Sequence, residues 1–244
     1  MARKFLASST QYLQVTATPL SGFPATMACW AYPPTDGSAE TFFAICDASS
    51  SNQRLEIRMN AGTAGDPAQV LCKIGVANSS AAINFNAWNS IVGIHRGQAD
   101  RDIVLNGALN NNTTNSVITI SNLDTIVIGR RTNSTPATYT DAAIAWCALW
   151  DVELTLQEAQ AFCNGWHPTL IRPQNLIRFY PLGGFDGADT EDKCIITGEQ
   201  LTANGSPTTQ QHSGGLIYPT RPHKVISTAI AATGNRRRRI LLGT

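Results

Sequence analysis

The sequence predicts an all-β protein whose strands form a two-layered antiparallel sandwich, with one short helix and an extended C-terminal arm. Charged residues make up only 14% of the chain, and turn-forming residues such as glycine and proline are frequent. Short apolar segments recur at regular intervals between these turn formers. Short strands joined by tight turns give this pattern. At 244 residues the chain is long enough to bury a sizeable core.

The expected strands follow one another along the first 150 residues. Residues 55–62 alternate most clearly, with the apolar residues Leu55, Ile57 and Met59 on one face. Glu56 lies on the other face, which we expect to be solvated. The segments that predict strands are residues 26–32, 39–48, 55–62, 70–76, 87–96, 102–109, 117–120, 125–131 and 142–150.

One short helix is expected at about residues 156–164. Thr155 is a good N-cap, and Glu158 stands at the third helical position, where it completes a capping box. Gly165 can adopt the left-handed conformation that ends a helix, and Pro168 prevents its renewal. Apolar residues at helical spacing predict that this helix packs on the edge of the sandwich.

Six cysteines are scattered along the chain without the close spacing of a metal site or a redox pair. A cysteine inside an apolar strand behaves as a small hydrophobic residue. We therefore expect buried free thiols, with disulfides and metal ligation as the alternatives, and assembly in a reducing cytoplasm. The six residues are Cys29, Cys46, Cys72, Cys147, Cys163 and Cys194.

Several segments together resemble the laminin-G-like, concanavalin A-like jelly roll. The resemblance covers roughly residues 5–182, and the order and spacing of the motifs carry it. It implies a jelly-roll β-sandwich over residues 1–182. Residues 183–244 would then supply closing strands and an extended Gly/Pro/Ser/Thr-rich arm that ends in an arginine cluster. The motifs are FLASSTQYLQV (5–15), ATMACWAYP (25–33), AWNSIVGIHR (87–96) with DIVLNG (102–107), TIVIGRR (125–131) and IAWCALWDVELTLQEAQAFCNG (144–165).

Two features depart from the family pattern. Ala145 and Trp146 occupy strand positions at which many relatives have acidic side chains, so an ion or ligand role at that strand is not supported. Residues 176–194 resemble a segment that usually opens such domains, but here it falls late in the chain. A closing strand moved to the C-terminal side would account for this position, and so would a truncated second unit.

The sequence lacks the groups that glycan cleavage needs, so we expect no enzyme, no catalytic residue and no cofactor. Glycosidases place two carboxylates across the scissile bond. The Glu-x-Asp-x-x-Glu motif of the glucanase relatives is missing. The four histidines lie apart in the sequence. We expect His95 at a surface or hydrogen-bonded position, and His167 to make local hydrogen bonds.

Calcium is the metal that remains open. Many laminin-G-like relatives hold it with loop carboxylates and carbonyls at the rim of the sandwich. The loop candidates are Asp47, Asp66, Asp100 and Asp102, each of which also suits a simple turn. The sequence defines no ligand set among them.

The five tryptophans raise the question of sugar stacking. Trp30, Trp146 and Trp150 lie in expected strands and Trp88 at a strand start, where packing between the sheets is the expected use. Trp166, just after the helix, is the candidate for exposure and therefore for contact with a glycan.

The C-terminal tail differs in charge from the rest of the chain. No Asp or Glu follows Glu199, whereas the preceding part is net acidic. The arginines suit an acidic protein surface or phosphates, and the apolar residues after them suit a groove on a partner. We do not expect nucleic acid, because no aromatic platform accompanies the charge, or a membrane, because no apolar run is long enough. The candidate partner-binding residues are Arg236, Arg237, Arg238, Arg239, Ile240, Leu241 and Leu242.

Chains of this kind resemble virion proteins of tailed bacteriophages that carry a jelly roll as a decoration, fibre or tail-surface module. The resemblance implies a non-enzymatic structural protein, assembled in the host cytoplasm into the virion. It would dock on its own copies or on other virion proteins through the sandwich and the arm. The alternative is a lectin-like module that recognises host surface glycans, and a divergent glycoside hydrolase is a third reading.

Overall fold

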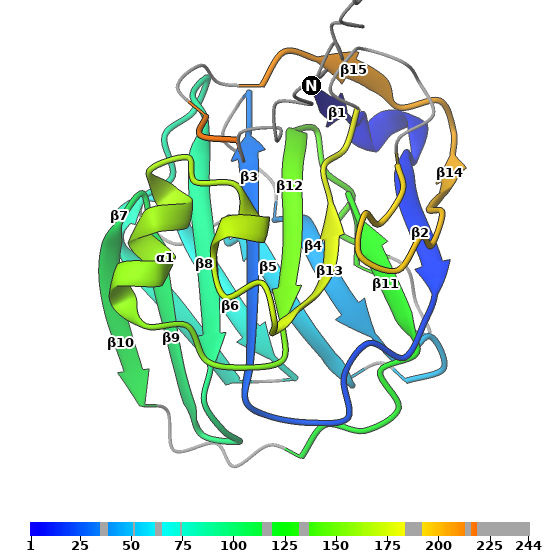
Figure 1. Ribbon diagram of the computed structural model, residues 1–244. Coiled ribbons are helices and arrows are strands. Elements are labelled where there is room, and N and C mark those ends of the chain that lie inside the picture. Colours follow the sequence, from blue (N-terminus) through cyan, green and yellow to red (C-terminus); the bar gives the residue numbers. More distant parts are fainter. Residues whose placement is uncertain are drawn as a thin grey trace, which may run out of the picture.

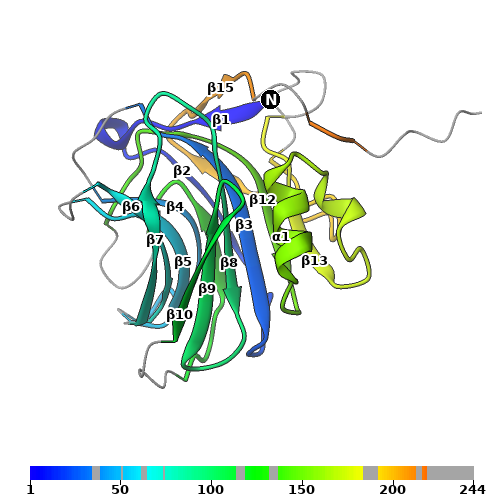
Figure 2. The ribbon, with the colours of Figure 1, turned by 90° about the vertical axis from the view of Figure 1, so that its left-hand side faces the viewer.

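The computed structural model describes residues 1–34, 39–50, 52–61, 65–73, 75–113, 119–131, 137–183, 192–212 and 216–218. In these residues two antiparallel sheets, sheet A and sheet B, pack face to face, and a helix covers the outer face of sheet A (Figures 1 and 2). The predicted all-β sandwich with one short helix is confirmed. The partner-binding residues expected at 236–242 lie outside the described residues.

Sheet A contains eight strands within the described residues, and β12 at its centre pairs with three of them. Their order is β10-β9-β8-β3-β12-β1-β15, with β13 also paired to β12. The strands are β1 (Ala2–Lys4), β3 (Ala25–Tyr32), β8 (Asn89–His95), β9 (Asp100–Leu105), β10 (Ala108–Thr113), β12 (Ala143–Trp150), β13 (Leu176–Tyr180) and β15 (Thr208–Gln210).

Sheet B contains seven strands within the described part of the chain, in the order β14-β2-β11-β4-β5-β6-β7. They are β2 (Tyr12–Thr16), β4 (Glu40–Cys46), β5 (Arg54–Met59), β6 (Pro67–Cys72), β7 (Gly75–Ala82), β11 (Thr125–Ile128) and β14 (Thr202–Asn204). Short 3₁₀ turns, η1 (Ala7–Ser9) and η2 (Pro168–Leu170), follow β1 and the helix α1 (Leu156–Cys163).

Two of the expected strands differ from the structure. Residues 70–76 form the end of β6 and the start of β7, because Lys73 takes a left-handed conformation with φ of 54° and turns the chain. β7 consists of small and polar residues, GVANSSAA, so apolar alternation did not reveal it. Of residues 117–120, the structure describes 119 and 120, and neither is in a strand.

The helix α1 forms where the sequence predicts it. The Thr155 side chain accepts a hydrogen bond from the Glu158 backbone, and the Glu158 side chain accepts one from the Thr155 backbone, so the capping box is confirmed. Gly165 has a φ of 85° after the helix. The helix buries Ala159 and Phe162 on the outer face of sheet A. The expectation that it lies on the sandwich edge is therefore wrong.

The apolar residues form two layers. The first lies between the sheets, and the second lies between sheet A and α1. Trp30, Trp146 and Trp150 belong to the second layer, so the expectation that they pack between the sheets is wrong. Successive strand residues face opposite sides of a sheet. In β3, Cys29 and Ala31 enter the first layer, which places Trp30 toward the helix.

A bulge in β12 lets two strands share one of its edges. Its pairing with β3 shifts between Ala145 and Ala148, and Trp146 has a φ of 51° within this bulge. Before the bulge β12 pairs with β1, and after it β12 pairs with β13. The Trp146 N–H donates to the Pro181 carbonyl at 3.2 Å. The late segment at residues 176–180 is therefore a strand of this same sandwich.

All six cysteines have free thiols, as expected. Five are buried and Cys163 is half-buried. Burial raises the pKa of the Cys72 thiol to about 11. A thiol with so high a pKa is a poor nucleophile, so Cys72 serves as a small core residue.

In the residues that the structure describes, no helix is both long and apolar enough to cross a membrane.

Candidate functional site

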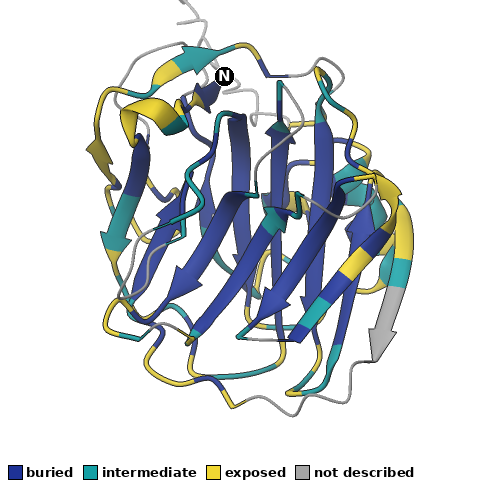
Figure 3. Cartoon of the chain, turned by 180° about the vertical axis from the view of Figure 1, so that it is seen from behind, coloured by how far each residue is buried: buried dark blue, intermediate teal, exposed yellow. Residues whose placement is uncertain are grey.

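The outer face of sheet B carries polar and charged side chains on the side of the molecule opposite α1 (Figure 2). Because Leu55, Ile57 and Met59 of β5 enter the core, the intervening residues of that strand face outward. Figure 3 looks on to this side and shows that most of its strand residues are nevertheless buried. We call this surface the polar face, and it comprises Tyr12, Gln14, Thr41, Arg54, Glu56, Arg58, Gln69, Asn78, Arg130, Arg131, Thr138 and Tyr139.

Glu56 occupies the centre of the polar face and is fully buried. Its carboxylate accepts a hydrogen bond from the Thr41 hydroxyl and an ion-paired one from Arg54 Nε at 3.0 Å. The Thr41 hydroxyl lies 2.7 Å from that of Thr138, which belongs to a segment lying against β4. The expectation that Glu56 is solvated is therefore wrong, because these partners enclose it.

A second set of hydrogen bonds crosses β5, β6 and β7. Arg58 Nε donates to Gln69 Oε1 at 2.7 Å, and Gln69 Nε2 donates to Asn78 Oδ1 at 2.6 Å. Burial lowers the pKa of Arg58, and Arg54 and Arg131 nearby lower it further, whereas Glu56 acts in the opposite direction. This row fixes planar polar groups at the surface of three neighbouring strands.

Two tyrosines hold Arg130 at the other side of the polar face. The Arg130 guanidinium lies 3.5 Å from the centroid of the Tyr12 ring, within the range of a cation–π interaction. It donates to the Tyr139 hydroxyl and to Gln14 Oε1, both at 3.2 Å. Arg130 is only 7% exposed, so its position is fixed by packing as well as by hydrogen bonds.

The polar face offers donors and acceptors but little acid–base chemistry. Guanidinium and amide groups have fixed, planar hydrogen-bonding geometry. Glu56 is held as a carboxylate acceptor by Arg54 and Thr41. A ligand rich in hydroxyl groups or in anionic oxygens suits such a surface.

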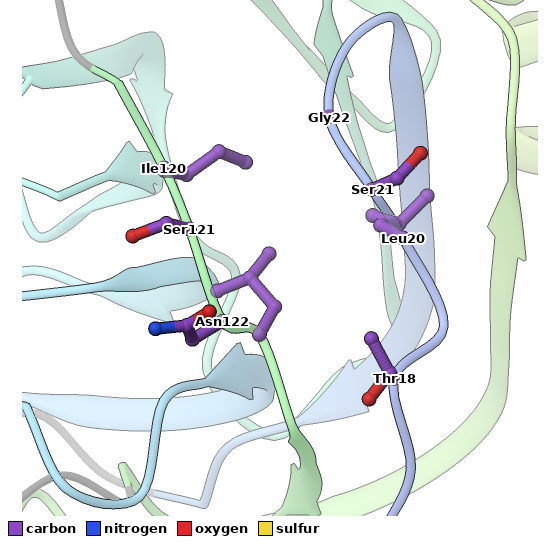
Figure 4. Close-up of a pocket in the computed structure, with 8 residues that line it drawn as sticks. Thr18, Leu20, Ser21, Gly22, Ile120, Ser121 and Asn122 are labelled. Carbon is purple, nitrogen blue, oxygen red and sulfur yellow. The ribbon is translucent and has the colours of Figure 1, made fainter.

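Two small hollows lie beside the loop at residues 18–24, and both are lined in part by residues 20–22. One, of about 140 Å³, is lined by that loop and by residues 120–123 (Figure 4). Ile120 points into it, whereas the Ser121 and Asn122 side chains point away. The other, of about 290 Å³, includes Asp151 and Ile177. Both are smaller than most ligand sites, and the first has few polar groups directed inward.

Trp166, predicted as the glycan contact, is 43% exposed in the turn after α1. Its neighbours pair with residue 217, since the Ile217 N–H donates to the Gly165 carbonyl and the His167 N–H donates to the Ile217 carbonyl. Ile217 and Tyr218 are also exposed there. Trp166 is on the helix side of sheet A and does not meet the polar face. Its binding role stays a prediction.

The structure places two of the histidines in apolar surroundings. His95 is fully buried and stacks on Phe23, and neither of its ring nitrogens has a hydrogen-bond partner within the described residues. The expectation of a surface or hydrogen-bonded position is wrong for His95. Burial, with a smaller effect of Arg101, lowers its pKa to about 3. His167 makes the expected local bond, with Nδ1 2.7 Å from the Thr169 hydroxyl.

The calcium candidates do not form one common site in the described residues. Asp47 accepts from both the backbone N–H and the hydroxyl of Ser49, as a turn former does. Asp100 and Asp102 both pair with Arg96. No group of three or more His, Cys, Asp or Glu side chains suited to a metal occurs among the described residues. Calcium binding stays a prediction without a ligand set.

Sequence reasoning missed the polar face as a site. Alternation in residues 55–62 assigned Glu56 to the right face, but it gave no sign that Arg130 and Tyr139 lie on the same face. The usable signal was the outward polar residue in each of the next two strands of the sheet, Gln69 in β6 and Asn78 in β7.

The chain belongs to the concanavalin A-like lectin/glucanases superfamily, whose family profile matches residues 7–160. A search of curated proteins finds no match. Among solved structures, a heptameric SAP-like pentraxin from Limulus polyphemus is similar, with a TM-score of 0.56 and 13% identity over 84% of this chain and 92% of that one. A putative carbohydrate binding protein from Bacteroides ovatus ATCC 8483 has a TM-score of 0.58 and 15% identity, over 85% of this chain and 61% of that one. At these identities the likeness concerns the fold.

Proposed function

We propose that this protein is a non-catalytic carbohydrate-binding module that holds a saccharide on the polar face. The observation that carries the proposal is the cluster of Tyr12, Arg130, Tyr139 and Gln14, together with the adjoining row from Arg58 to Asn78. Membership of a superfamily described by lectins and glucanases supports it, as does the B. ovatus protein of the same fold described as a putative carbohydrate binding protein.

The chemistry of sugars fits these groups. A saccharide presents hydroxyl groups around a ring whose C–H face is apolar, so it is held by fixed polar groups next to an aromatic surface. Tyr139 is half-buried and supplies such a surface. Gln14 is half-buried and Asn78 is exposed, and both supply amides that donate and accept. Gln69 is buried and holds Asn78 through its own amide.

The absence of catalysis is part of the proposal. Glycoside hydrolysis uses two carboxyl groups about 5–10 Å apart, one on each side of the glycosidic bond. Glu56 is the acidic residue of the polar face as defined above, and its carboxylate is held by Arg54 and Thr41. The other acid of these strands, Glu40, accepts from the Thr140 hydroxyl at 2.8 Å.

A glycan array with the full-length protein tests the proposal. We expect specific binding that Tyr139→Ala reduces by about ten- to a hundredfold, which corresponds to about 1.4–2.8 kcal/mol for the loss of an aromatic contact at a binding site. Trp166→Ala is the matched control, since it removes an exposed aromatic ring from the opposite side of the molecule. Binding that is lost in Trp166→Ala and kept in Tyr139→Ala would place the sugar at the helix turn instead.

We propose as a second candidate the role of a virion component of a tailed bacteriophage that docks on its own copies or other virion proteins. What supports it is the sequence of the tail, in which Arg236–Arg239 precede the apolar residues Ile240–Leu242. Light scattering of the full chain and of a chain ending at residue 218 tests it. We expect the full chain to assemble and the shortened chain to be monomeric. A full chain that is monomeric, or assembly that survives the truncation, contradicts this role.

A further inference from the structure

Three arginines of the polar face lack an acidic partner. In the described residues Arg58, Arg130 and Arg131 form no salt bridge with a carboxylate. Other arginines of the chain do pair in this way: Arg3 with Asp192, Arg54 with Glu56, Arg96 with Asp102, Arg172 with Glu158 and Arg178 with Glu199. Within the described residues, three arginines without a carboxylate ion pair therefore lie on this one surface.

These three side chains are also partly or fully removed from water. Arg130 is 7% exposed, and its Nε is buried without a hydrogen-bond partner in the described residues. Arg58 and Arg131 are half-buried, and the Nε of Arg131 is likewise buried and without a partner there. A buried donor that makes no hydrogen bond destabilises a protein, and a ligand that accepts from other N–H groups of the same side chains would offset part of that cost.

The hydrogen-bond acceptors of Arg58 and Arg130 are neutral groups. Arg58 donates to an amide oxygen of Gln69, and Arg130 donates to Tyr139 and Gln14. Burial lowers the pKa of Arg58. Among the charges near it, Glu56 favours the charged form and Arg54 and Arg131 disfavour it, so one carboxylate lies among three guanidinium groups. A second carboxylate bound beside Arg58 and Arg131 would offset the excess of positive charge there and accept N–H groups in a bidentate geometry.

We propose that Arg58, Arg130 and Arg131 select saccharides that carry a carboxylate, such as uronic acids. The inference rests on the proposed carbohydrate binding at the polar face and narrows it to acidic sugars. The sugar carboxylate accepts from the arginines, while Tyr139 and the neighbouring amides contact the ring and its hydroxyl groups.

Paired saccharides that differ only in charge test the inference. The full-length protein is titrated calorimetrically with oligogalacturonate and with hyaluronan fragments, each beside its carboxyl-reduced form, and an array of acidic and neutral glycans is screened in parallel. We expect the bound glycans to carry carboxylates, with affinity lost by at least about tenfold on carboxyl reduction and falling further as salt rises.

Variants separate the arginines from general effects of charge. Arg58→Gln and Arg131→Gln should each weaken binding of the acidic glycan by about ten- to a hundredfold, and Arg130→Lys should weaken it less than Arg130→Gln because it keeps the charge but loses the planar fork. Arg172→Gln, on the helix side, is the control with the same change of net charge. Without ligand, Arg58→Gln and Arg131→Gln should have a Tm equal to or above that of the parent protein.

The possible outcomes distinguish this inference from the proposed function. Neutral glycans that bind, with affinity lost in Tyr139→Ala but unchanged in Arg58→Gln and Arg131→Gln, would leave carbohydrate binding intact and overturn acidic selectivity. A chain that binds no glycan at all overturns both. A marked fall in the ligand-free Tm of Arg58→Gln and Arg131→Gln, together with their loss of glycan affinity, would assign these residues a structural role.

Discussion

At the scale of single residues, Glu40 in β4 shows how burial changes the chemistry of a side chain. It is 3% exposed and accepts a hydrogen bond from the neutral hydroxyl of Thr140. Burial raises its pKa from 4.5 to about 7, more than the hydrogen bond from Thr140 lowers it. The carboxyl group is therefore protonated in the folded protein over a pH range in which it ionises in the unfolded chain.

This residue makes the stability depend on pH in a definite direction. Between pH 4.5 and about 7 the folded state keeps a proton that the unfolded state releases, so the free energy of unfolding falls as pH rises through this window. The shift corresponds to a loss on the order of 3 kcal/mol, complete above pH 7. Glu40→Gln cannot ionise, and we expect it to be more stable than the parent protein at pH 8.

Urea denaturation of both proteins at pH 4.5 and pH 8 measures this effect, because the other titrating groups cancel in the difference between the two proteins. The advantage of Glu40→Gln should grow with pH. A difference that is the same at both pH values would show that Glu40 ionises at its ordinary pKa in the folded state.

Single residues are also where sequence reasoning failed most often. Alternation correctly assigned Glu56 to an outward face, but it could not foresee that Arg54, Thr41 and Thr138 enclose it, because Thr138 comes from a distant part of the chain. His95 was expected at a surface or hydrogen-bonded position, yet it is buried against Phe23, a contact that no local pattern predicts.

At the scale of elements, α1 depends on the aromatic residues beneath it. The Phe162 ring is fully buried, with its centroid 6.2 Å from that of Trp30, 6.5 Å from that of Trp146 and 6.4 Å from that of Trp150. We expect Phe162→Ala to lower the free energy of unfolding by about 3–5 kcal/mol, because it leaves a cavity between the helix and sheet A.

The control for this prediction is Gln157→Ala, an exposed position of the same helix, which should change the free energy by less than about 0.5 kcal/mol. Denaturation followed by tryptophan fluorescence gives both values. A loss below about 1 kcal/mol in Phe162→Ala would mean that α1 contributes little to the fold.

Elements with strong local signals were predicted well, and those without them were not. The capping box at Thr155 and Glu158 defined α1 almost to the residue. β7 escaped notice because its small polar residues have no apolar alternation, and it is a strand only because β6 offers it backbone hydrogen bonds. The position of α1 on a face of sheet A depends on where the tryptophans point, and the bulge in β12 decides this for Trp146 and Trp150.

At the scale of the whole molecule, the resemblance to the jelly roll gave the sandwich correctly, whereas the polar face as a site emerged only from the packing. Its groups come from β2, β4, β5, β6, β7 and the segment after β11, and no one stretch of sequence contains them. The same holds for His212, which lies within 5.5 Å, centroid to centroid, of Trp30, Trp88 and Trp146 on the far side.

The pairing of β1 has a consequence for how the chain is made. Residues 2–4 pair on one edge with residues 143 and 144 and on the other with residues 208–210. Sheet A therefore cannot be completed during synthesis until residues 208–210 have left the ribosome. Until then β1 lacks its partner strand β15. Such distant pairings slow folding, and the finishing step comes after translation of the sandwich.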